Sequence, residues 1–232
     1  MRLRNNFPAF GLRSVAGKRH SRRNSAQNGA MHRARRVFLR FAVAALAAAA
    51  SGADAKQPAA RDLPALFSAL EKADAVVEGA SSPKRILHIF FDANCWYCHL
   101  TWKALQHYEK AGLQVRWVPV AFQKESSTPK AAAIMQAKDR AAALRENELG
   151  YKPESYDGGI APAKPSKALE AQLEANFDLM DRFGVSGTPG LVWKDEKGRV
   201  RVKTGMPRLS QLPAITGLPA QKIDDPELAD FR

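Results

Sequence analysis

The sequence predicts an α/β fold, and three of its segments carry that prediction. Residues 85–91 (RILHIFF) form a nearly unbroken apolar run of strand length, which is typical of a strand buried on both faces of a sheet. A helix is expected from Cys95 to about Lys110, and residues 113–122 alternate well enough for a second strand. Because a helix connects them, the two strands are expected to pair in parallel.

A further helix is predicted before this β-α-β unit. Asp62 is a suitable N-cap, and Pro64 suits the first turn. Apolar residues then recur at helical spacing, and Gly79 and Pro83 would close the helix. These apolar residues are Leu63, Leu66, Phe67, Leu70 and Val77. We expect this element, within residues 56–83, to be a linker-like helix that packs on the main domain.

Two longer helices are expected after the second strand. One starts at Thr128-Pro129, runs through residues 131–144 and ends near Gly150. Ser166 would cap the other, which ends at Phe183-Gly184. The stretch between them is rich in Gly, Pro and Lys, which indicates a surface loop.

The C-terminal part of the chain indicates a β-hairpin and a short helix. Residues 191–193 and 200–202 are strand-like and flank the turn sequence Asp195-Glu-Lys-Gly198. Residues 210–215 are expected to form a short helix, and residues 218–232 a polar tail. The order strand, helix, strand, helices, hairpin, helix is that of the thioredoxin fold. The predicted domain covers residues 84–217, with a helical insertion at about 126–183.

The charge of the chain is concentrated at its N-terminus. The 232 residues carry a formal net charge of +13, but residues 1–55 hold 11 of the 36 Lys and Arg and only one acidic residue, Asp54. The remaining 25 basic and 22 acidic residues nearly balance. The basicity therefore belongs to a leader, and we expect no nucleic-acid partner.

That leader is typical of an export signal. Arginines at 33–40 form a basic region, residues 41–50 an apolar region, and Ala53-Asp-Ala55 a cleavage site that ends at Ala55. The apolar run is shorter than the ~20 residues that a membrane span needs. The sequence therefore predicts an exported, periplasmic protein, through either the general or the twin-arginine route, since Arg35-Arg36 allows both. Met31 is an alternative start to Met1.

The only two cysteines lie in Cys95-Trp96-Tyr97-Cys98-His99, a string that fits two chemistries. Cys-x-x-Cys at a helix start is a redox-active pair, whereas Cys-x-x-Cys-His is also an attachment site for c-type haem. A purely structural disulfide is a poor third interpretation, because so small a loop gains little stabilisation from chain entropy.

In the redox interpretation, Cys95 is the nucleophile. A helix N-terminus and a Cys-x-x-Cys setting lower the pKa of the first thiol, and so favour its thiolate. Cys98, one turn further on, would resolve the mixed disulfide by attacking Cys95. Trp96 and Tyr97 are expected to lie near the sulfurs and to tune the redox balance.

A second part of the site is expected at Thr188-Pro189, just before the hairpin. Cis peptide bonds are rare and almost confined to proline. In a thioredoxin fold a cis-proline at this place abuts the disulfide, and the backbone before it pairs with an extended substrate segment. Thr188 and Pro189 are therefore the predicted substrate-binding residues.

These motifs resemble the DsbC/DsbG family of periplasmic disulfide isomerases. The resemblance rests on Phe90-Phe-Asp-x-x-Cys95-x-Tyr97-Cys98 and Gly187-Thr188-Pro189, and covers roughly residues 64–217. Residues 69–79 resemble the linker helix of that family, and residues 130–134 and 205–207 match its DsbG branch more closely. The resemblance implies Cys95 as nucleophile, Cys98 as resolving cysteine, and no cofactor besides their disulfide. It also implies exported proteins with cysteines as substrates, and a DsbD-like membrane thiol reductase as partner.

The chain departs from the family pattern in two ways. Trp96 replaces the small residue or proline usual between the cysteines. The N-terminal dimerisation domain of the family is missing, so we expect a monomer. An isomerase, a reductase of oxidised cysteines and a dithiol oxidase all stay open.

In the haem interpretation, Cys95 and Cys98 would bind haem, with His99 as axial ligand. Met135, Met180 or Met206 would be the sixth ligand. A motif that directly follows a buried strand argues against this, because haem folds of that class are mainly helical. A zinc site is disfavoured too, because there is no second Cys-x-x-Cys and the other histidines are scattered. In the redox interpretation His99 is expected to be partly exposed and without a role.

Overall fold

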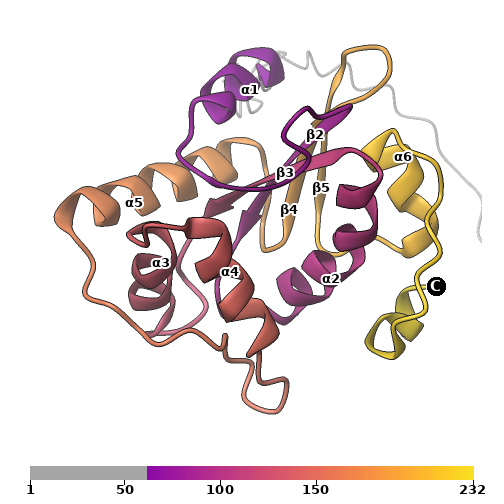
Figure 1. The fold of residues 1–232 in the computed structure, drawn as a ribbon. Helices are drawn as coiled ribbons and strands as arrows, with labels where there is room; N and C mark the ends of the chain where they lie inside the picture. The colour runs from indigo at the N-terminus through magenta and orange to yellow at the C-terminus, as the bar shows by residue number, and fades with distance from the viewer. Residues whose placement is uncertain (1–61) are drawn as a thin grey trace, which may run out of the picture. The chain divides into compact units, whose positions relative to one another are not determined.

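The computed structural model describes residues 62–232, so the predicted signal peptide at 1–55 lies outside the described part. Its centre is a five-stranded sheet in the order β1-β3-β2-β4-β5 (Figure 1). The strands are β1 (Val76–Gly79), β2 (Arg85–Phe91), β3 (Leu113–Pro119), β4 (Gly190–Lys194) and β5 (Val200–Thr204). β2 and β3 are parallel and β4 and β5 antiparallel, which confirms the predicted β-α-β unit and hairpin.

Helices cover both faces of this sheet. They are α1 (Leu63–Glu71), α2 (Trp96–Lys110), α3 (Ser127–Met135), α4 (Arg140–Leu149), α5 (Lys167–Arg182) and α6 (Leu212–Thr216). Two short 3₁₀ helices, η1 (Leu209–Gln211) and η2 (Pro226–Phe231), lie near the C-terminus. None of the helices within residues 62–232 has the length and hydropathy that a membrane span requires.

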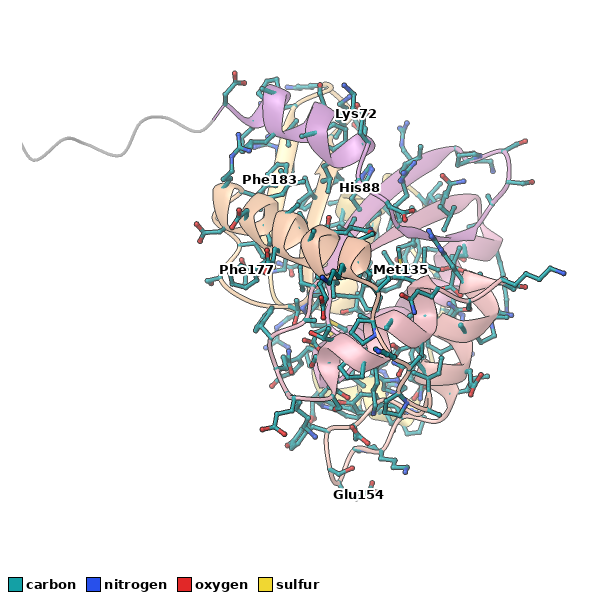
Figure 2. All side chains as sticks on the ribbon, turned by 90° about the vertical axis from the view of Figure 1, so that its left-hand side faces the viewer. Lys72, His88, Met135, Glu154, Phe177 and Phe183 are labelled. Atoms are coloured by element: carbon teal, nitrogen blue, oxygen red, sulfur yellow. The ribbon has the colours of Figure 1, made fainter. Side chains whose placement is uncertain are left out.

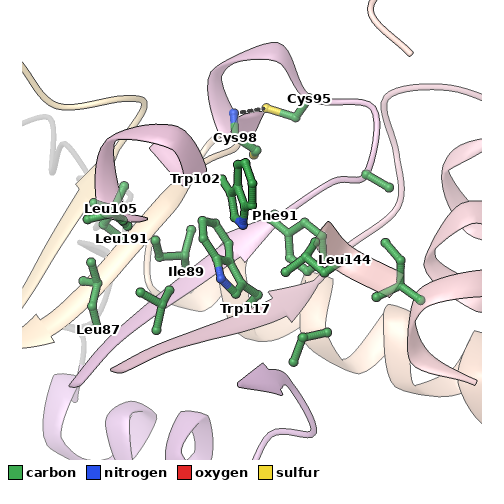
Figure 3. Close-up of a cluster of buried hydrophobic side chains, with 14 of the residues drawn as sticks. Leu87, Ile89, Phe91, Cys95, Cys98, Trp102, Leu105, Trp117, Leu144 and Leu191 are labelled. Atoms are coloured by element: carbon green, nitrogen blue, oxygen red, sulfur yellow. Dashed lines mark hydrogen bonds between the residues drawn. The ribbon is translucent and has the colours of Figure 1, made fainter. Parts of the chain in front are cut away.

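Side chains of β2 alternate between two hydrophobic clusters, one on each face of the sheet. Leu87, Ile89 and Phe91 pack in the cluster that includes residues of α2, α3 and α6 (Figure 3). Phe90 packs with residues of α1 and α5 on the opposite face. This double burial explains why the strand has almost no polar residues. The loop after Phe91, which leads to the cysteines, lies at the edge of the sheet where the parallel strands β2 and β3 end.

The predicted linker helix is wrong beyond Glu71. α1 ends there, and Val76–Gly79 instead form β1, which pairs antiparallel with β3. Burial alternates with the strand period, because Val76 and Glu78 are buried whereas Val77 is exposed. Two adjacent β-branched valines also favour a strand over a helix. The sheet therefore begins inside the segment that the sequence assigned to a linker.

The insertion and the tail also differ from the prediction. The single helix expected from 128 to about 150 is two helices, α3 and α4, and the Asp139 side chain caps α4 by accepting a hydrogen bond from Ala142 N at 2.9 Å. The second strand ends at Pro119 instead of 122, and the last helix is η1 followed by α6. The predicted polar tail contains the buried Ile223 and Leu228, and its η2 packs against α2.

Candidate active site

Cys95 is the N-cap of α2, as the sequence predicts. Its sulfur accepts a hydrogen bond from the backbone N–H of Cys98 at 3.2 Å (Figure 3). This N–H is one of the free donors at the start of every helix. A capping sulfur takes the place that a serine or aspartate oxygen occupies in other helices, and the same donor stabilises negative charge on it.

The peptide bond between Thr188 and Pro189 is cis, which confirms that prediction. The Cys95 thiol donates a hydrogen bond to the carbonyl oxygen of Thr188, with Sγ and O separated by 3.4 Å. The fold therefore brings together two predicted site segments that are 93 residues apart. Gln123, which the sequence analysis missed, donates from Nε2 to Thr188 Oγ1 at 2.8 Å.

Both thiols are almost fully buried, Cys95 at 2% and Cys98 at 1% exposure, but their pKa values shift in opposite directions. The pKa of Cys95 is lowered, chiefly by a hydrogen bond from the Cys98 side chain, with help from Thr188, the Cys98 backbone and Gln123, while burial opposes the shift. Burial, followed by the neighbouring Cys95, raises the pKa of Cys98 well above its usual value. Cys95 is thus the thiol that ionises first.

The residues between the cysteines point in different directions. Trp96 is partly buried; its ring stacks on His99 at a centroid distance of 5.4 Å and meets Tyr151 in a tilted arrangement at 5.6 Å. Tyr97 is 51% exposed and meets Phe231 edge to face. Within residues 62–232 neither side chain hydrogen-bonds to a cysteine sulfur, so redox tuning by Trp96 and Tyr97 stays a prediction.

His99 is not the partly exposed residue that the sequence analysis expected. It is 7% exposed, its Nδ1 lies 3.1 Å from Glu148 Oε2, and its ring stacks on Tyr151 at 4.7 Å. Its other ring nitrogen lies 3.8 Å from Glu227 of η2. The ring is therefore already enclosed by protein groups, which does not fit an axial ligand of haem. Within the described range, no group of three or more His, Cys, Asp or Glu side chains is arranged to hold a metal ion.

Asp92, at the end of β2, organises the loops around the cysteines. One carboxylate oxygen accepts from Asn94 N and Ser127 Oγ, at 2.9 and 2.8 Å. The other accepts from the backbone N–H of Phe122 and Gln123, at 2.9 and 3.1 Å. Because Gln123 in turn contacts Thr188, this buried carboxylate links the loop before Cys95 to the cis-proline segment.

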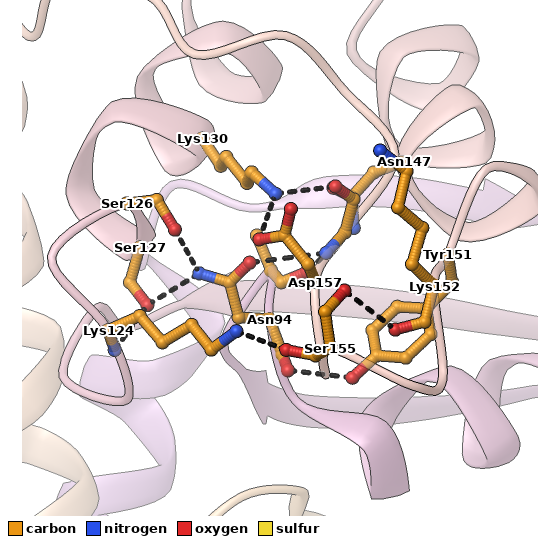
Figure 4. A network of polar contacts seen from close by, with 12 residues as sticks. Asn94, Lys124, Ser126, Ser127, Lys130, Asn147, Tyr151, Lys152, Ser155 and Asp157 are labelled. Carbon is orange, nitrogen blue, oxygen red and sulfur yellow. Dashed lines mark hydrogen bonds and ion pairs between the residues drawn. The ribbon is translucent and has the colours of Figure 1, made fainter.

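The insertion is tied to the same loop through Asn94 (Figure 4). The Asn94 side chain donates to Ser126 and Ser127 and accepts from Gly158 N. The backbone carbonyl oxygen of Asn94 accepts from the Tyr151 hydroxyl. Asn147 adds a bond to the carbonyl of Ala93, and the buried Lys130 pairs with Asp157. Polar residues scattered over the predicted loop and helices thus converge on the active-site loop, and only the fold reveals them.

Comparison with known proteins agrees with this geometry. The chain is 30% identical over 154 residues to the thiol:disulfide interchange protein DsbG of Pseudomonas aeruginosa, a match that covers 66% of the chain and 59% of the relative. It is 32% identical over 123 residues to DsbC of Haemophilus influenzae, covering 52% of the chain and 49% of that relative. The chain therefore spans about half to three-fifths of the length of these relatives.

Solved structures show the same fold. A periplasmic thioredoxin-like protein from Salmonella enterica serovar Typhimurium superimposes with a TM-score of 0.52 at 23% identity, over 65% of this chain and 93% of that one. None of the comparisons supports the haem interpretation. Residues 70–215 match the family described as a thioredoxin-like domain, which is well over half of the chain. The chain therefore belongs to the thioredoxin-like domain family.

Proposed function

We propose that this protein is a periplasmic thiol:disulfide oxidoreductase of the isomerase or reductase type, acting on cysteines of exported proteins. One observation carries the proposal: the Cys95 sulfur sits at the N-terminus of α2, 3.2 Å from Cys98 N and 3.4 Å from the carbonyl oxygen before the cis-proline. The names of the relatives, thiol:disulfide interchange proteins, support the same chemistry.

The reaction begins with the Cys95 thiolate, which attacks one sulfur of a substrate disulfide and releases the other as a thiolate. A mixed disulfide between Cys95 and the substrate results. Cys98 then loses its proton and attacks the Cys95 sulfur, which frees the second substrate thiol and leaves a Cys95–Cys98 disulfide. Two electrons pass from the cysteine pair to the substrate. In an isomerisation, a substrate thiol displaces Cys95 before Cys98 acts, so no net electron transfer occurs.

The two pKa directions suit these roles. A lowered pKa increases the thiolate fraction of Cys95 at any given pH and also makes it a better leaving group. Cys98, whose pKa is raised by burial, stays protonated and does not compete for the substrate. Thr188 and Pro189 would hold an extended substrate segment across Cys95, because their backbone lies beside its sulfur.

The proposal includes a reductant and an oligomeric state. A reductase needs its disulfide returned to two thiols, and we assign this to a membrane thiol reductase of the DsbD type. We also propose that the protein acts as a monomer, in line with a sheet that is covered on both faces by helices of the same chain. Gel filtration tests the second point, and a dimer would contradict it.

Trapping tests the mechanism directly. A Cys98→Ala variant produced in the periplasm should accumulate mixed disulfides with other proteins, seen as bands that disappear on reduction. The Cys95→Ala variant is the matched control and should form none. If Cys98→Ala forms no adducts, the exchange mechanism is wrong. The reduction potential then decides the type, since a value near −120 mV indicates an oxidase and one near −270 mV a reductase.

A further inference from the structure

A groove lies beside the active site, between the loop after β3 and the helix α5. Its volume is about 650 Å³. The loop and the start of α3 supply Ala121, Phe122 and Thr128, and α5 supplies Glu170, Leu173, Glu174, Phe177 and Asp178. The five residues of α5 fall at positions i, i+3, i+4, i+7 and i+8, so they form one stripe along the helix. Phe177 is labelled on α5 in Figure 2.

The groove exposes two aromatic side chains that touch each other. Phe122 and Phe177 meet edge to face with centroids 5.5 Å apart, yet they stay 44% and 43% exposed. Adjacent exposed aromatic rings in a concave surface are a feature of binding sites, because they offer a large apolar area at little entropic cost. The residue after Phe122 is Gln123, whose side chain reaches Thr188. One wall of the groove therefore adjoins, along the chain, the residue that contacts the cis-proline segment.

The rim of the groove is acidic. Glu170, Glu174 and Asp178 follow one another at i, i+4 and i+8, a spacing at which like charges on a helix repel. Within residues 62–232, none of the three carboxylates has an ion-pair partner. The row is therefore complementary to positive charge that comes from outside the described chain.

We propose that this groove binds a segment of the substrate polypeptide in which an aromatic or large aliphatic side chain lies next to Lys or Arg, a few residues from the reacting cysteine. The apolar side chain would pack between Phe122 and Phe177, and the cation would meet the acidic row. This inference rests on the proposed function and adds a substrate class to it. The protein would thus prefer cysteines in basic, apolar segments that are unfolded enough to enter the groove.

Model substrates test this preference. Each is a peptide with one cysteine in a mixed disulfide with thionitrobenzoate, and carries Phe-Lys-Lys, Phe-Glu-Glu or Ser-Lys-Lys at two to six residues from that cysteine. The reduced full-length protein converts each substrate to peptide thiol and thionitrobenzoate while its own cysteines become a disulfide, so the released dye gives the rate. We expect Phe-Lys-Lys to react about tenfold faster than either other arm at its best spacing, and this ratio to fall as salt is added.

Substitutions in the groove separate the contribution of the acidic row from that of the two aromatic side chains. Glu174→Lys should reduce the preference for the Lys peptide over the Glu peptide, because the charge of the acidic row falls from −3 to −1, and Phe177→Ser should bring the Phe and Ser peptides to within about twofold. The control is Glu154→Lys, an equal charge change at an exposed residue, far from Phe177 in Figure 2, which should leave every ratio unchanged. Equal rates for all peptides, or an unchanged ratio in Glu174→Lys, would overturn the inference.

A control substrate, the small mixed disulfide of thionitrobenzoate with 2-mercaptoethanol, distinguishes failure of the groove proposal from failure of the proposed oxidoreductase function. All variants should reduce it at the wild-type rate, because it is too small to reach the groove. If it reacts but the peptides do not differ, the groove proposal fails and the oxidoreductase proposal survives. If it does not react at all, the oxidoreductase proposal itself fails. A dimer that Phe177→Ser dissociates would show that a second copy fills the groove, and would also overturn the inference.

Discussion

Replacing Asp92 by Asn should strongly destabilise the protein, although the two side chains have the same shape. Asp92 is 1% exposed, and its carboxylate accepts four hydrogen bonds, three from two loops and one from Ser127 at the start of α3. In the variant, the amide oxygen can still accept from Asn94 N and Ser127 Oγ. The amide nitrogen then faces the backbone N–H groups of Phe122 and Gln123, so that donors oppose donors.

The magnitude follows from the number of bonds lost. A hydrogen bond to a charged group contributes about 1.5–3 kcal/mol, and the two lost bonds correspond to about 3–6 kcal/mol. Small domains unfold with free energies of about 5–15 kcal/mol, so Asp92→Asn removes a large part of the stability. At about 2–4 °C per kcal/mol for a domain of this size, Tm should fall by about 6–24 °C.

Urea unfolding followed by tryptophan fluorescence and circular dichroism measures this loss. The m value should be unchanged, because the same surface is exposed on unfolding. Asp181→Asn is the matched control, since Asp181 is exposed on α5 and should change stability by less than about 0.5 kcal/mol. A loss below about 1 kcal/mol in Asp92→Asn would refute the view that this carboxylate joins the two loops.

Three further predictions test the tail, a buried histidine and the active thiol. Leu228→Ala should cost about 2–4 kcal/mol in urea unfolding, because Leu228 is fully buried in the C-terminal segment, and an unaffected midpoint would show that this segment does not belong to the cooperative core. Burial, with the nearby charges of Arg116 and Lys194, lowers the pKa of His88 from 6.5 to about 4. As the pH falls, His88 therefore takes up a proton in the unfolded chain before it does so in the folded protein. The contribution of neutral His88 to the free energy of unfolding is present above pH 6.5, and about 3 kcal/mol of it is lost as the pH falls towards 4. A His88→Phe variant should flatten the plot of unfolding free energy against pH in this range. Gln123→Ala should raise the pKa of Cys95, measured from the thiolate absorbance against pH, and an unchanged or lower value would contradict a role for Gln123.

The elements that the sequence predicted well are those whose burial is complete or strictly periodic. The run from Arg85 to Phe91 is apolar because both of its faces pack against helices, and local composition records that directly. β1 was missed because an edge strand of four residues has one exposed side and too few residues to show a period. Val77 happened to continue the helical spacing of α1, and only pairing with β3 decides between the alternatives.

The cysteines and the cis-proline could be predicted because each has a local signature, whereas the residues that support them have none. Asp92, Gln123 and Asn94 act through partners about 30 to 65 residues away along the chain. No periodicity or spacing records such contacts, since they depend on how the insertion folds back. The same holds for the tail, where the buried Leu218, Ile223 and Leu228 are too widely spaced among other residues to show a period.

The histidine that follows the cysteine pair shows why the insertion matters to the site. His99 stacks on Tyr151, a residue of the insertion, Trp96 packs against the same ring in a tilted arrangement, and Glu148 from the same region hydrogen-bonds to His99. A small residue or a proline at position 96 would leave the rings of His99 and Tyr151 without this cover. Trp96, the departure from the family pattern, is therefore best explained by packing against the insertion. Because the ring of Trp96 is turned towards His99 and Tyr151, we expect Trp96 to affect the cysteines chiefly by holding the start of α2 in place.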